Sequence, residues 1–234
     1  MMNMIQRPSP NFNPRPGGTD IDILVFHYTG MKSAAAALER MCDPGAEVSA
    51  HYMIDEDGST YQLVGEASRA WHAGVSNWRG NSNINDRSIG IELVNPGHEF
   101  GYQRFAQAQM TALITLAKDI LARHPIPARN VVGHSDIAPT RKQDPGEFFD
   151  WAALAAEDIG YWPAKSSTDP HTQPTTSDLA PILEEYGYDT DDMEAALLAF
   201  QRHFHPSNCS GQADAESVEI LGLVNLELHL LDHH

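Results

Sequence analysis

The sequence predicts an α/β fold followed by a small helical region at the C-terminus. Two apolar runs, Ile21 to Tyr28 and Ile89 to Val94, are typical of strands in a sheet. Apolar residues also recur at helical spacing, most clearly from Phe105 to Arg123. A chain of 234 residues is long enough for one medium domain and a small second one.

The first half of the chain supplies most of the predicted sheet. Ile21 to Tyr28 (IDILVFHY) is nearly unbroken in apolar character, which predicts a strand buried on both faces. Ser33 to Met41 predicts a helix with Ser33 as its N-cap. His51 to Val64 predicts a β-hairpin that turns at Asp57-Gly58. Ser76 to Asp86 is rich in Asn and predicts a long loop.

The strand from Ile89 to Val94 presents two different faces. Ile89, Ile91 and Leu93 point one way, whereas Gly90, Glu92 and Val94 point the other.

The helix from Phe105 to Arg123 carries one apolar stripe, and Pro125 ends it. The stripe consists of Phe105, Ala108, Ala112, Leu113, Leu116, Ala117 and Ile120. Asn130 to Gly133 predicts a short strand, and Pro145 to Ile159 is partly helical in pattern. Residues 1–162 therefore predict one domain.

Residues 163–176 (PAKSSTDPHTQPTT) are polar and contain three prolines, which predicts a semi-extended linker. Residues 177–234 then show two or three short amphipathic helices, the last from about Ala213 to Leu228. In the second, one face carries Met193, Ala196, Leu197, Phe200 and Phe204.

The composition excludes several classes of partner. A net charge of -17 disfavours binding to nucleic acid or anionic membrane surfaces. No apolar run approaches the roughly 20 residues of a membrane helix. Met1 to Gly18 contains no stretch typical of a signal peptide, which predicts a cytoplasmic protein. A removed leader would instead place it in the periplasm or at the outer membrane. The sequence implies no protein partner.

The cysteines restrict what kind of metal site the chain can form. Cys42 and Cys209 are far apart and form no Cys-x-x-Cys pair, so a thiolate zinc site is excluded. A metal must bind to histidine and carboxylate ligands, and the chain has 12 histidines.

Three residues form a candidate metal site. His27 and His134 each stand at the C-terminal end of a predicted strand, and Asp144 follows ten residues after His134. If both strands run the same way in one sheet, the imidazoles meet at one sheet edge. Two imidazoles and one carboxylate leave a fourth tetrahedral position for water, as in catalytic zinc sites.

Glu92 and Lys142 are candidate helpers at that site. Glu92 lies on the strand face opposite the apolar stripe, where a carboxylate could move a proton between water and a leaving amine. Lys142 lies two residues before Asp144, where an ammonium would stabilise an oxyanion. Taken alone, a strand-end histidine is more often a capping residue, Glu92 could be a salt-bridged structural carboxylate, and Lys142 could be a solvated loop residue.

Six segments, in this order and spacing, resemble the bacterial N-acetylmuramoyl-L-alanine amidase family over about Ile21 to Trp162. They are FHYTG, SAHYMIDEDGSTYQLV, AWHAG, SIGIELVN, VVGHSDIAPTRKQDPG and FFDW. The family is related to phage amidase lysozymes and animal peptidoglycan recognition proteins. The resemblance implies a mixed central β-sheet flanked by helices, with one Zn²⁺ in a surface groove.

By position, the resemblance assigns the zinc ligands to His27, His134 and Asp144, and the catalytic roles to Glu92 and Lys142. None of these five positions departs from the family pattern. His51 and His72 match recurrent family positions and are expected in the substrate groove or behind the ligands. Trp71 and Trp78 are candidates for the sugar groove, with the core as the alternative for Trp71.

The resemblance implies hydrolysis of the bond between N-acetylmuramic acid, or its 1,6-anhydro form, and L-alanine in peptidoglycan or muropeptides. Two alternatives are a non-catalytic peptidoglycan-binding protein on the same fold and cleavage of a different peptidoglycan amide.

The C-terminal region resembles a small three-helix peptidoglycan-binding module through LEEYGYD and AFQRHFHP. The alternative is a helical cap packed on the first domain. With a separate module, removal of residues 177–234 is expected to spare cleavage of small muropeptides and weaken wall binding.

Overall fold

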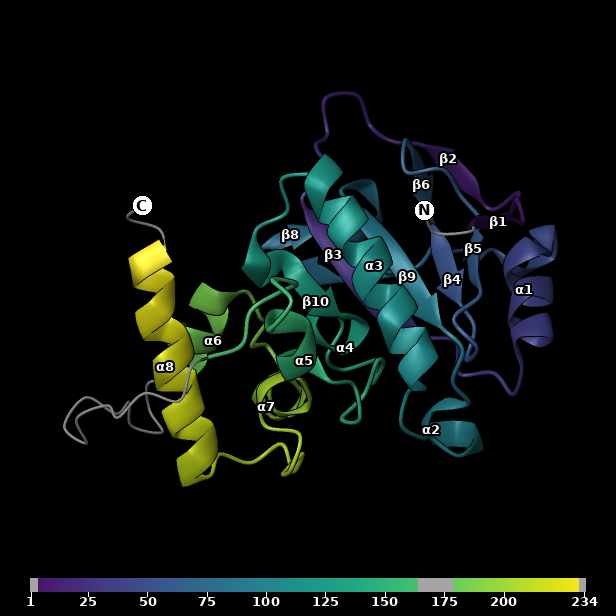
Figure 1. Ribbon diagram of the computed structural model, residues 1–234. Helices are drawn as coiled ribbons and strands as arrows, with labels where there is room; N and C mark the ends of the chain where they lie inside the picture. Colours follow the sequence, from purple (N-terminus) through teal and green to yellow (C-terminus); the bar gives the residue numbers. More distant parts are fainter. Residues whose placement is uncertain (1–3, 164–178, 232–234) are drawn as a thin grey trace.

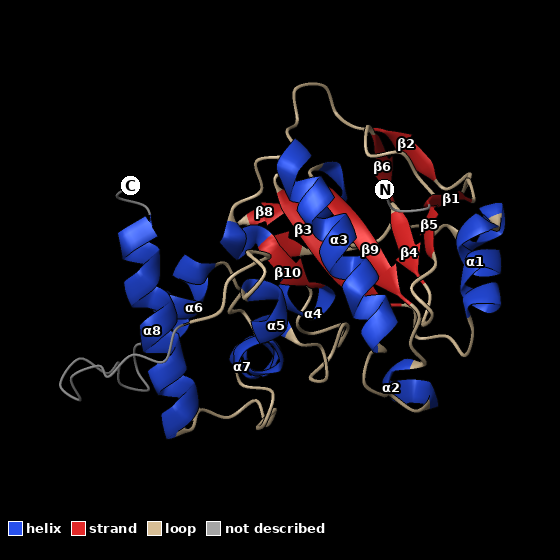
Figure 2. Cartoon of the chain, viewed as in Figure 1, coloured by secondary structure: helices blue, strands red, loops and turns tan. Residues whose placement is uncertain are grey.

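The computed structural model describes residues 4–163 and 179–231, so nearly all of the predicted linker at 163–176 lies outside the described residues. A six-stranded mixed sheet forms the centre, with helices on both faces (Figures 1 and 2). Its strands, in spatial order, are β1 (Met4–Gln6), β5 (Thr60–Gln62), β4 (Tyr52–Ile54), β9 (Ser88–Leu93), β3 (Ile23–Tyr28) and β10 (Val131–Gly133). The predicted fold class is confirmed.

Four further strands form two small sheets beside the main one. They are β2 (Phe12–Pro14) with β6 (Ser68–Ala70), and β7 (Asn77–Trp78) with β8 (Asn81–Ser82). The long loop predicted at residues 76–86 is therefore a short hairpin followed by a 3₁₀ turn, η2 (Ile84–Asp86). Strands β1, β2, β7 and β8 are only two or three residues long, which is too short to show a period in the sequence.

The α-helices lie outside the sheet. They are α1 (Ala34–Cys42), α2 (Gly97–Phe100), α3 (Gln107–Arg123), α4 (His134–Ile137), α5 (Trp151–Ala155), α6 (Leu179–Tyr186), α7 (Met193–Phe204) and α8 (Ala215–Leu231). Two more 3₁₀ turns are η1 (Pro44–Ala46) and η3 (Ala128–Asn130). Ser33 is the N-cap of α1 as predicted, since its side chain accepts a hydrogen bond from the Ala36 amide.

The four strands at the centre of the site run in the same direction. β4, β9, β3 and β10 are parallel, and in the six-stranded sheet as described the one antiparallel pairing is that of β4 with β5. The turn of this predicted hairpin lies at Asp57-Gly58. Because parallel strands end at the same edge, residues at the carboxyl ends of β3, β9 and β10 are brought together.

The side chains of β9 alternate between the two faces of the sheet, as predicted. Ile89, Ile91 and Leu93 pack with one face of α3, whose buried residues include Leu113 and Ile120. Glu92 lies on the opposite face of the sheet. The prediction that Ala108 belongs to the buried stripe of α3 is wrong. Ala108 is exposed, and its neighbour Gln109 is buried instead.

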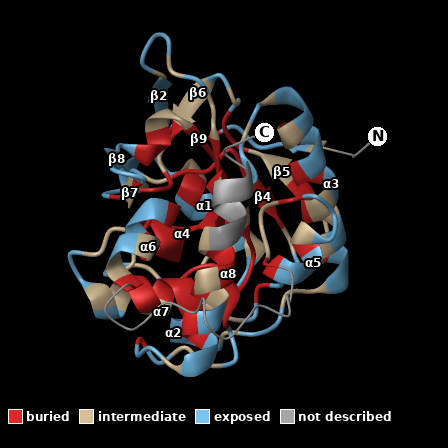
Figure 3. Cartoon of the chain, turned by 90° about the vertical axis from the view of Figure 1, so that its left-hand side faces the viewer, coloured by how far each residue is buried: buried red, intermediate tan, exposed pale blue. Residues whose placement is uncertain are grey.

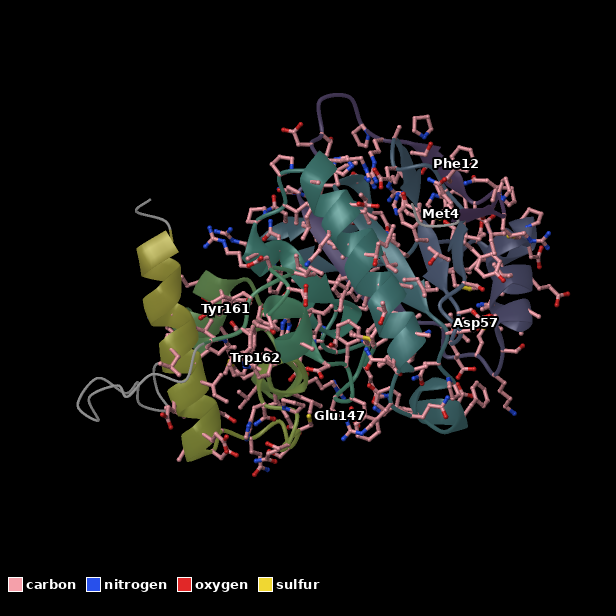
Figure 4. The ribbon with its side chains drawn as sticks, viewed as in Figure 1. Met4, Phe12, Asp57, Glu147, Tyr161 and Trp162 are labelled. Atoms are coloured by element: carbon pink, nitrogen blue, oxygen red, sulfur yellow. The ribbon has the colours of Figure 1, made fainter. Side chains whose placement is uncertain are left out.

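The C-terminal helices pack on the face of the sheet opposite α3. A single apolar cluster joins Val25 of β3 and Val132 of β10 to Leu183 of α6 and Phe200 of α7. Figure 3 shows this buried interior beneath α8, and α7 packs against α4. In Figure 4, Tyr161 and Trp162 lie where these helices meet the rest of the chain, and both rings contact Phe204.

This shared core bears on the predicted organisation into two domains. The helices of the C-terminal region complete the hydrophobic cluster of the sheet, so the described contacts are those of a packed cap. Because of this shared cluster, removal of residues 177–234 is expected to destabilise the remaining chain, whereas the separate module expected from the sequence would spare cleavage of small muropeptides. Within the described ranges, no helix is both long and apolar enough to cross a membrane.

Candidate metal-dependent active site

The predicted site forms at the carboxyl edge of three neighbouring strands. In the parallel pairing of β10 with β3, Gly133 is opposite Phe26, so the next residues, His134 and His27, extend from the same edge. In the pairing of β3 with β9, His27 is opposite Glu92. His27, Glu92 and His134, which are far apart in the sequence, therefore lie side by side near the carboxyl ends of three neighbouring strands.

Asp144 returns to this edge because the loop after α4 folds back. The Ser135 amide donates to the Asp144 carbonyl at 2.8 Å, which holds the loop against the start of α4. Gly133 makes room for the return, since a Cβ at this position would lie 2.6 Å from Cδ of Pro145. Any larger residue at position 133 would push Asp144 away from the histidines.

The three candidate ligands converge. His27 Nδ1, His134 Nδ1 and Asp144 Oδ2 lie 3.0 Å from one another in all three pairs. The far nitrogen of each imidazole is engaged elsewhere: His27 Nε2 lies 3.1 Å from His72 Nδ1, and His134 Nε2 lies 3.0 Å from the Ala73 carbonyl. The three residues are buried, and they form a group able to hold a metal ion.

This donor set fits a tetrahedral zinc ion. Bonds of about 2.0–2.1 Å place tetrahedral ligand atoms about 3.3 Å apart, close to the spacing seen here. Burial and the neighbouring His134 lower the pKa of His27 to about 4, so its imidazole is neutral, as a ligand must be. Burial alone would raise the pKa of Asp144, but the two imidazoles outweigh it and keep the carboxyl ionised.

Glu92 is the unpaired acid of the site. Its Oε2 is shielded from solvent and has no hydrogen-bond partner among the described residues. Burial, reinforced by the negative charge of Asp144, raises the pKa of Glu92 to about 8. The alternative role as a salt-bridged structural carboxylate is not what the structure shows. A partly buried carboxyl with this pKa is suited to accept and return a proton near neutral pH.

Lys142 lies in the loop between α4 and Asp144, and it is partly exposed. Its amide donates to the Ala138 carbonyl at 3.0 Å, which fixes the backbone near the site. Its charge lowers the pKa of both His27 and Glu92, so it acts on the site electrostatically.

The remaining sequence candidates have different environments. His51 is completely buried, with Nδ1 accepting from the Gly90 amide and Nε2 near the Ser68 carbonyl, so the groove role is wrong. Trp78 is also buried, against Tyr186 and Tyr188, and does not line a groove.

His72 and Trp71 differ from each other although they are adjacent. His72 is buried and lies directly behind His27, which agrees with the expected position behind the ligands. Trp71 is partly exposed, and its indole N–H donates to Asn13 Oδ1 at 2.9 Å.

A buried polar cluster behind His134 was not predicted. Asp136 accepts hydrogen bonds from the Gly133 amide, from Tyr188 Oη and from His203 Nδ1, at 2.7, 2.8 and 2.8 Å. The ring of His203 also stacks on Trp151. Tyr188 and His203 come from the C-terminal helical region, so no local sequence signal joins them to the GHSD segment.

Comparison with known proteins agrees with this geometry. A family model described as N-acetylmuramoyl-L-alanine amidase matches residues 17–147. The N-acetylmuramoyl-L-alanine amidase AmiD of Escherichia coli is 41% identical, over 86% of this chain and 80% of its own length. A 1,6-anhydro-N-acetylmuramyl-L-alanine amidase, AmpD of Haemophilus influenzae, is 38% identical, over 62% of this chain and 87% of its own.

Solved structures extend the similarity beyond the family model. The structure of the E. coli amidase AmiD in complex with anhydro-N-acetylmuramic acid-L-Ala-D-gamma-Glu-L-Lys is similar with a TM-score of 0.80 and 38% identity. That similarity covers 91% of this chain and 92% of the other. A Pseudomonas aeruginosa protein in complex with anhydromuramic pentapeptide has a TM-score of 0.79 and 36% identity, covering 91% and 94%. The family match, these relatives and the converging ligands lead to one conclusion: the chain belongs to the N-acetylmuramoyl-L-alanine amidase family.

Proposed function

We propose that this chain hydrolyses the amide bond between N-acetylmuramic acid, or its 1,6-anhydro form, and L-alanine in muropeptides, and serves cell-wall turnover and recycling. One observation carries the proposal: His27, His134 and Asp144 converge beside Glu92, a partly buried acid whose Oε2 has no hydrogen-bond partner among the described residues. The substrates named for the similar proteins support the choice of bond.

The site is proposed to hold one Zn²⁺ per chain on His27, His134 and Asp144. When bound, the ion supplies a Lewis acid that polarises the scissile carbonyl and makes water more acidic.

The other steps belong to side chains of this protein. Glu92 takes a proton from the attacking water and returns it to the departing L-alanine nitrogen. Because Oε2 of Glu92 has no competing donor, it is free to accept that proton. Lys142 brings positive charge toward the oxyanion as the carbonyl carbon becomes tetrahedral.

The proposal is tested with the full chain and anhydro-N-acetylmuramic acid-tripeptide. Mass spectrometry is expected to find the free tripeptide and the anhydro sugar acid, with no product after chelator treatment and recovery on adding zinc. Binding of the muropeptide without cleavage in the zinc-treated protein would favour the non-catalytic alternative. Products cut within the peptide would assign a different bond.

We also propose, from the sequence, a cytoplasmic location. Wall binding by residues 177–234 is the competing proposal, and it would place the protein in the periplasm or at the outer membrane. Fractionation of cells that produce the natural protein checks the location. Co-sedimentation of the chain with purified sacculi, compared with a variant altered on α8, checks wall binding. A protein that stays in the supernatant contradicts a wall-binding role.

A further inference from the structure

The two metal-facing imidazoles depend on one dipeptide behind them. His27 Nε2 lies 3.1 Å from His72 Nδ1, and His134 Nε2 lies 3.0 Å from the carbonyl of Ala73. A carbonyl can only accept, so His134 carries its proton on Nε2 and presents a bare Nδ1 to Asp144. The consecutive residues His72 and Ala73 therefore provide the hydrogen-bond acceptors for His27 and His134, respectively.

Ser88 fixes the direction of the hydrogen bonds on the His27 side. Its hydroxyl donates to the Ile84 carbonyl at 2.7 Å, which uses its single proton. Ser88 Oγ, 3.2 Å from His72 Nε2, must therefore accept there. A neutral His72 then has a bare Nδ1, and this atom accepts the Nε2 proton of His27.

The same dipeptide is anchored from the other side. Asn85 Oδ1 accepts hydrogen bonds from the amides of His72 and Ala73 at 3.1 and 2.8 Å. Gly90 of β9 lies against the His72 ring, where an added Cβ would come within 2.5 Å of it. His72, Asn85 and Ser88 are all buried, so water does not compete for these bonds.

We propose that His72 is a positioning residue, which, held by Asn85 and directed by Ser88, fixes the tautomer and orientation of His27 so that its bare Nδ1 faces the metal. The proposal rests on the metal site assigned above and deepens it. Histidine ligands in metalloproteins commonly donate their second N–H to such a partner, and loss of the partner weakens metal binding about 10- to 100-fold.

The test compares two substitutions of His72 by zinc affinity, measured by competition with a chromophoric chelator. His72→Asn keeps an acceptor near the position of Nδ1, whereas His72→Leu removes it. We expect His72→Leu to bind zinc about 10- to 100-fold more weakly than the unaltered chain, and His72→Asn to recover most of the loss. His124→Leu, at a histidine that pairs with Glu66 instead, is the matched control and keeps full affinity.

Equal zinc affinity in the His72→Leu variant would overturn the proposal, as would an equal loss in both His72 variants. Zinc affinity is separate from turnover: a chain that binds zinc in this pattern but cuts no muropeptide would contradict the proposed function and leave this inference standing. A chain that takes no zinc at all contradicts the metal site itself.

A second measurement needs no variant and so does not depend on the folding of an altered chain. In zinc-bound protein with ¹⁵N-labelled histidine, the ring nitrogen shifts of His72 are expected to show a proton on Nε2 and a bare Nδ1. A proton on His72 Nδ1 would reverse the hydrogen bond to His27 and refute the proposal.

Discussion

At the scale of single residues, Glu92 is partly buried, and its Oε2 is shielded from solvent without a hydrogen-bond partner among the described residues. A carboxyl oxygen shielded from water without a hydrogen-bond partner destabilises the folded state. Such groups are found mainly at functional sites, which agrees with the catalytic role proposed for Glu92. Its backbone position, opposite His27 in the neighbouring strand, is set by the parallel register.

Replacing Glu92 by Gln is expected to separate chemistry from metal binding. The amide has nearly the same shape but is not a proton acceptor of comparable strength, so kcat is expected to fall about 10²- to 10⁴-fold. Zinc content, measured by metal analysis of the purified variant, is expected to stay unchanged. Glu39→Gln, on the exposed side of α1, is the control. An unchanged rate in Glu92→Gln removes this residue from the mechanism.

Glu66 predicts how stability depends on pH. Burial alone would raise the pKa of Glu66, but hydrogen bonds from Arg123, His124 and Tyr52 outweigh it and lower the pKa to about 2. In the unfolded chain a Glu titrates near its ordinary value, about 4.3. The folded state therefore gains stability from ionised Glu66 above that value and loses it as pH falls toward 2.

The variant Glu66→Gln is accordingly expected to lose about 1–3 kcal/mol of unfolding free energy at pH 7. The difference from the unaltered chain should shrink as pH falls from about 4.3 toward about 2, the range between the unfolded and folded pKa values of Glu66. Urea unfolding at several pH values measures it. Glu157→Gln, in an ion pair with Lys118 that is about half exposed, should show little change at any pH. A pH-independent loss in Glu66→Gln contradicts this account.

The sequence predicted those parts of the site that depend on local patterns and missed those that depend on contacts between distant segments. Apolar patterns indicated only that His27 and His134 follow strands and that Glu92 lies on the strand face opposite the apolar stripe. Their roles in the site came from the family resemblance. The groove roles of His51 and Trp78 were wrong, because the sequence does not reveal how deeply a side chain is buried. His51 lies next to His72, which agrees with its other expected position, behind the ligands. The bond from His203 to Asp136 joins residues 67 apart in the sequence, and no period in either segment indicates it.

At the scale of elements, α3 shows where a helical pattern is incomplete. The stripe of apolar residues correctly predicted the buried face, but Gln109 lies on it instead of Ala108. Its Nε2 donates to the carbonyls of Ile54 and Val94 at 2.9 and 3.0 Å. These carbonyls lie where β4 and β9 stop pairing, so a polar side chain on an apolar face satisfies the ends of the strands.

Gln109→Ala is expected to destabilise the protein by about 2–3 kcal/mol, because the Val94 carbonyl loses its donor in a buried place. The Ile54 carbonyl keeps a hydrogen bond from the Val94 amide, which limits the loss. Thermal or urea unfolding of the variant measures the effect. Gln107→Ala, in the same helix but exposed, should change stability by no more than about 0.5 kcal/mol. Equal stabilities of the two variants would contradict the role given to Gln109.

At the scale of the whole molecule, the C-terminal helices and the sheet share both an apolar and a polar interior. Leu183 and Phe200 complete the cluster that contains Val25 and Val132. Tyr188 and His203 provide two of the hydrogen bonds to Asp136, which stands two residues after the ligand His134. Amphipathic periodicity indicated the apolar faces of these helices but not the surface that they cover.

A chain that ends at residue 162 is therefore expected to be much less stable than the full chain. It would expose Trp78 and Val25 to water and leave the Asp136 carboxylate without two of its donors. We expect a lower unfolding temperature and reduced zinc affinity, measured by calorimetry and chelator competition. An unchanged unfolding temperature and full turnover in the shortened chain would support the separate module.

The order of strands in the sheet also has a consequence for how the protein folds. β3 lies between β9 and β10. Its paired residues are 65 positions away in β9 and 107 positions away in β10, so these pairings close very large loops. Contacts of such sequence separation slow folding. All three ligand positions become neighbours only once these pairings exist, so uptake of a fluorescent metal reporter during refolding should lag behind the recovery of helical circular dichroism.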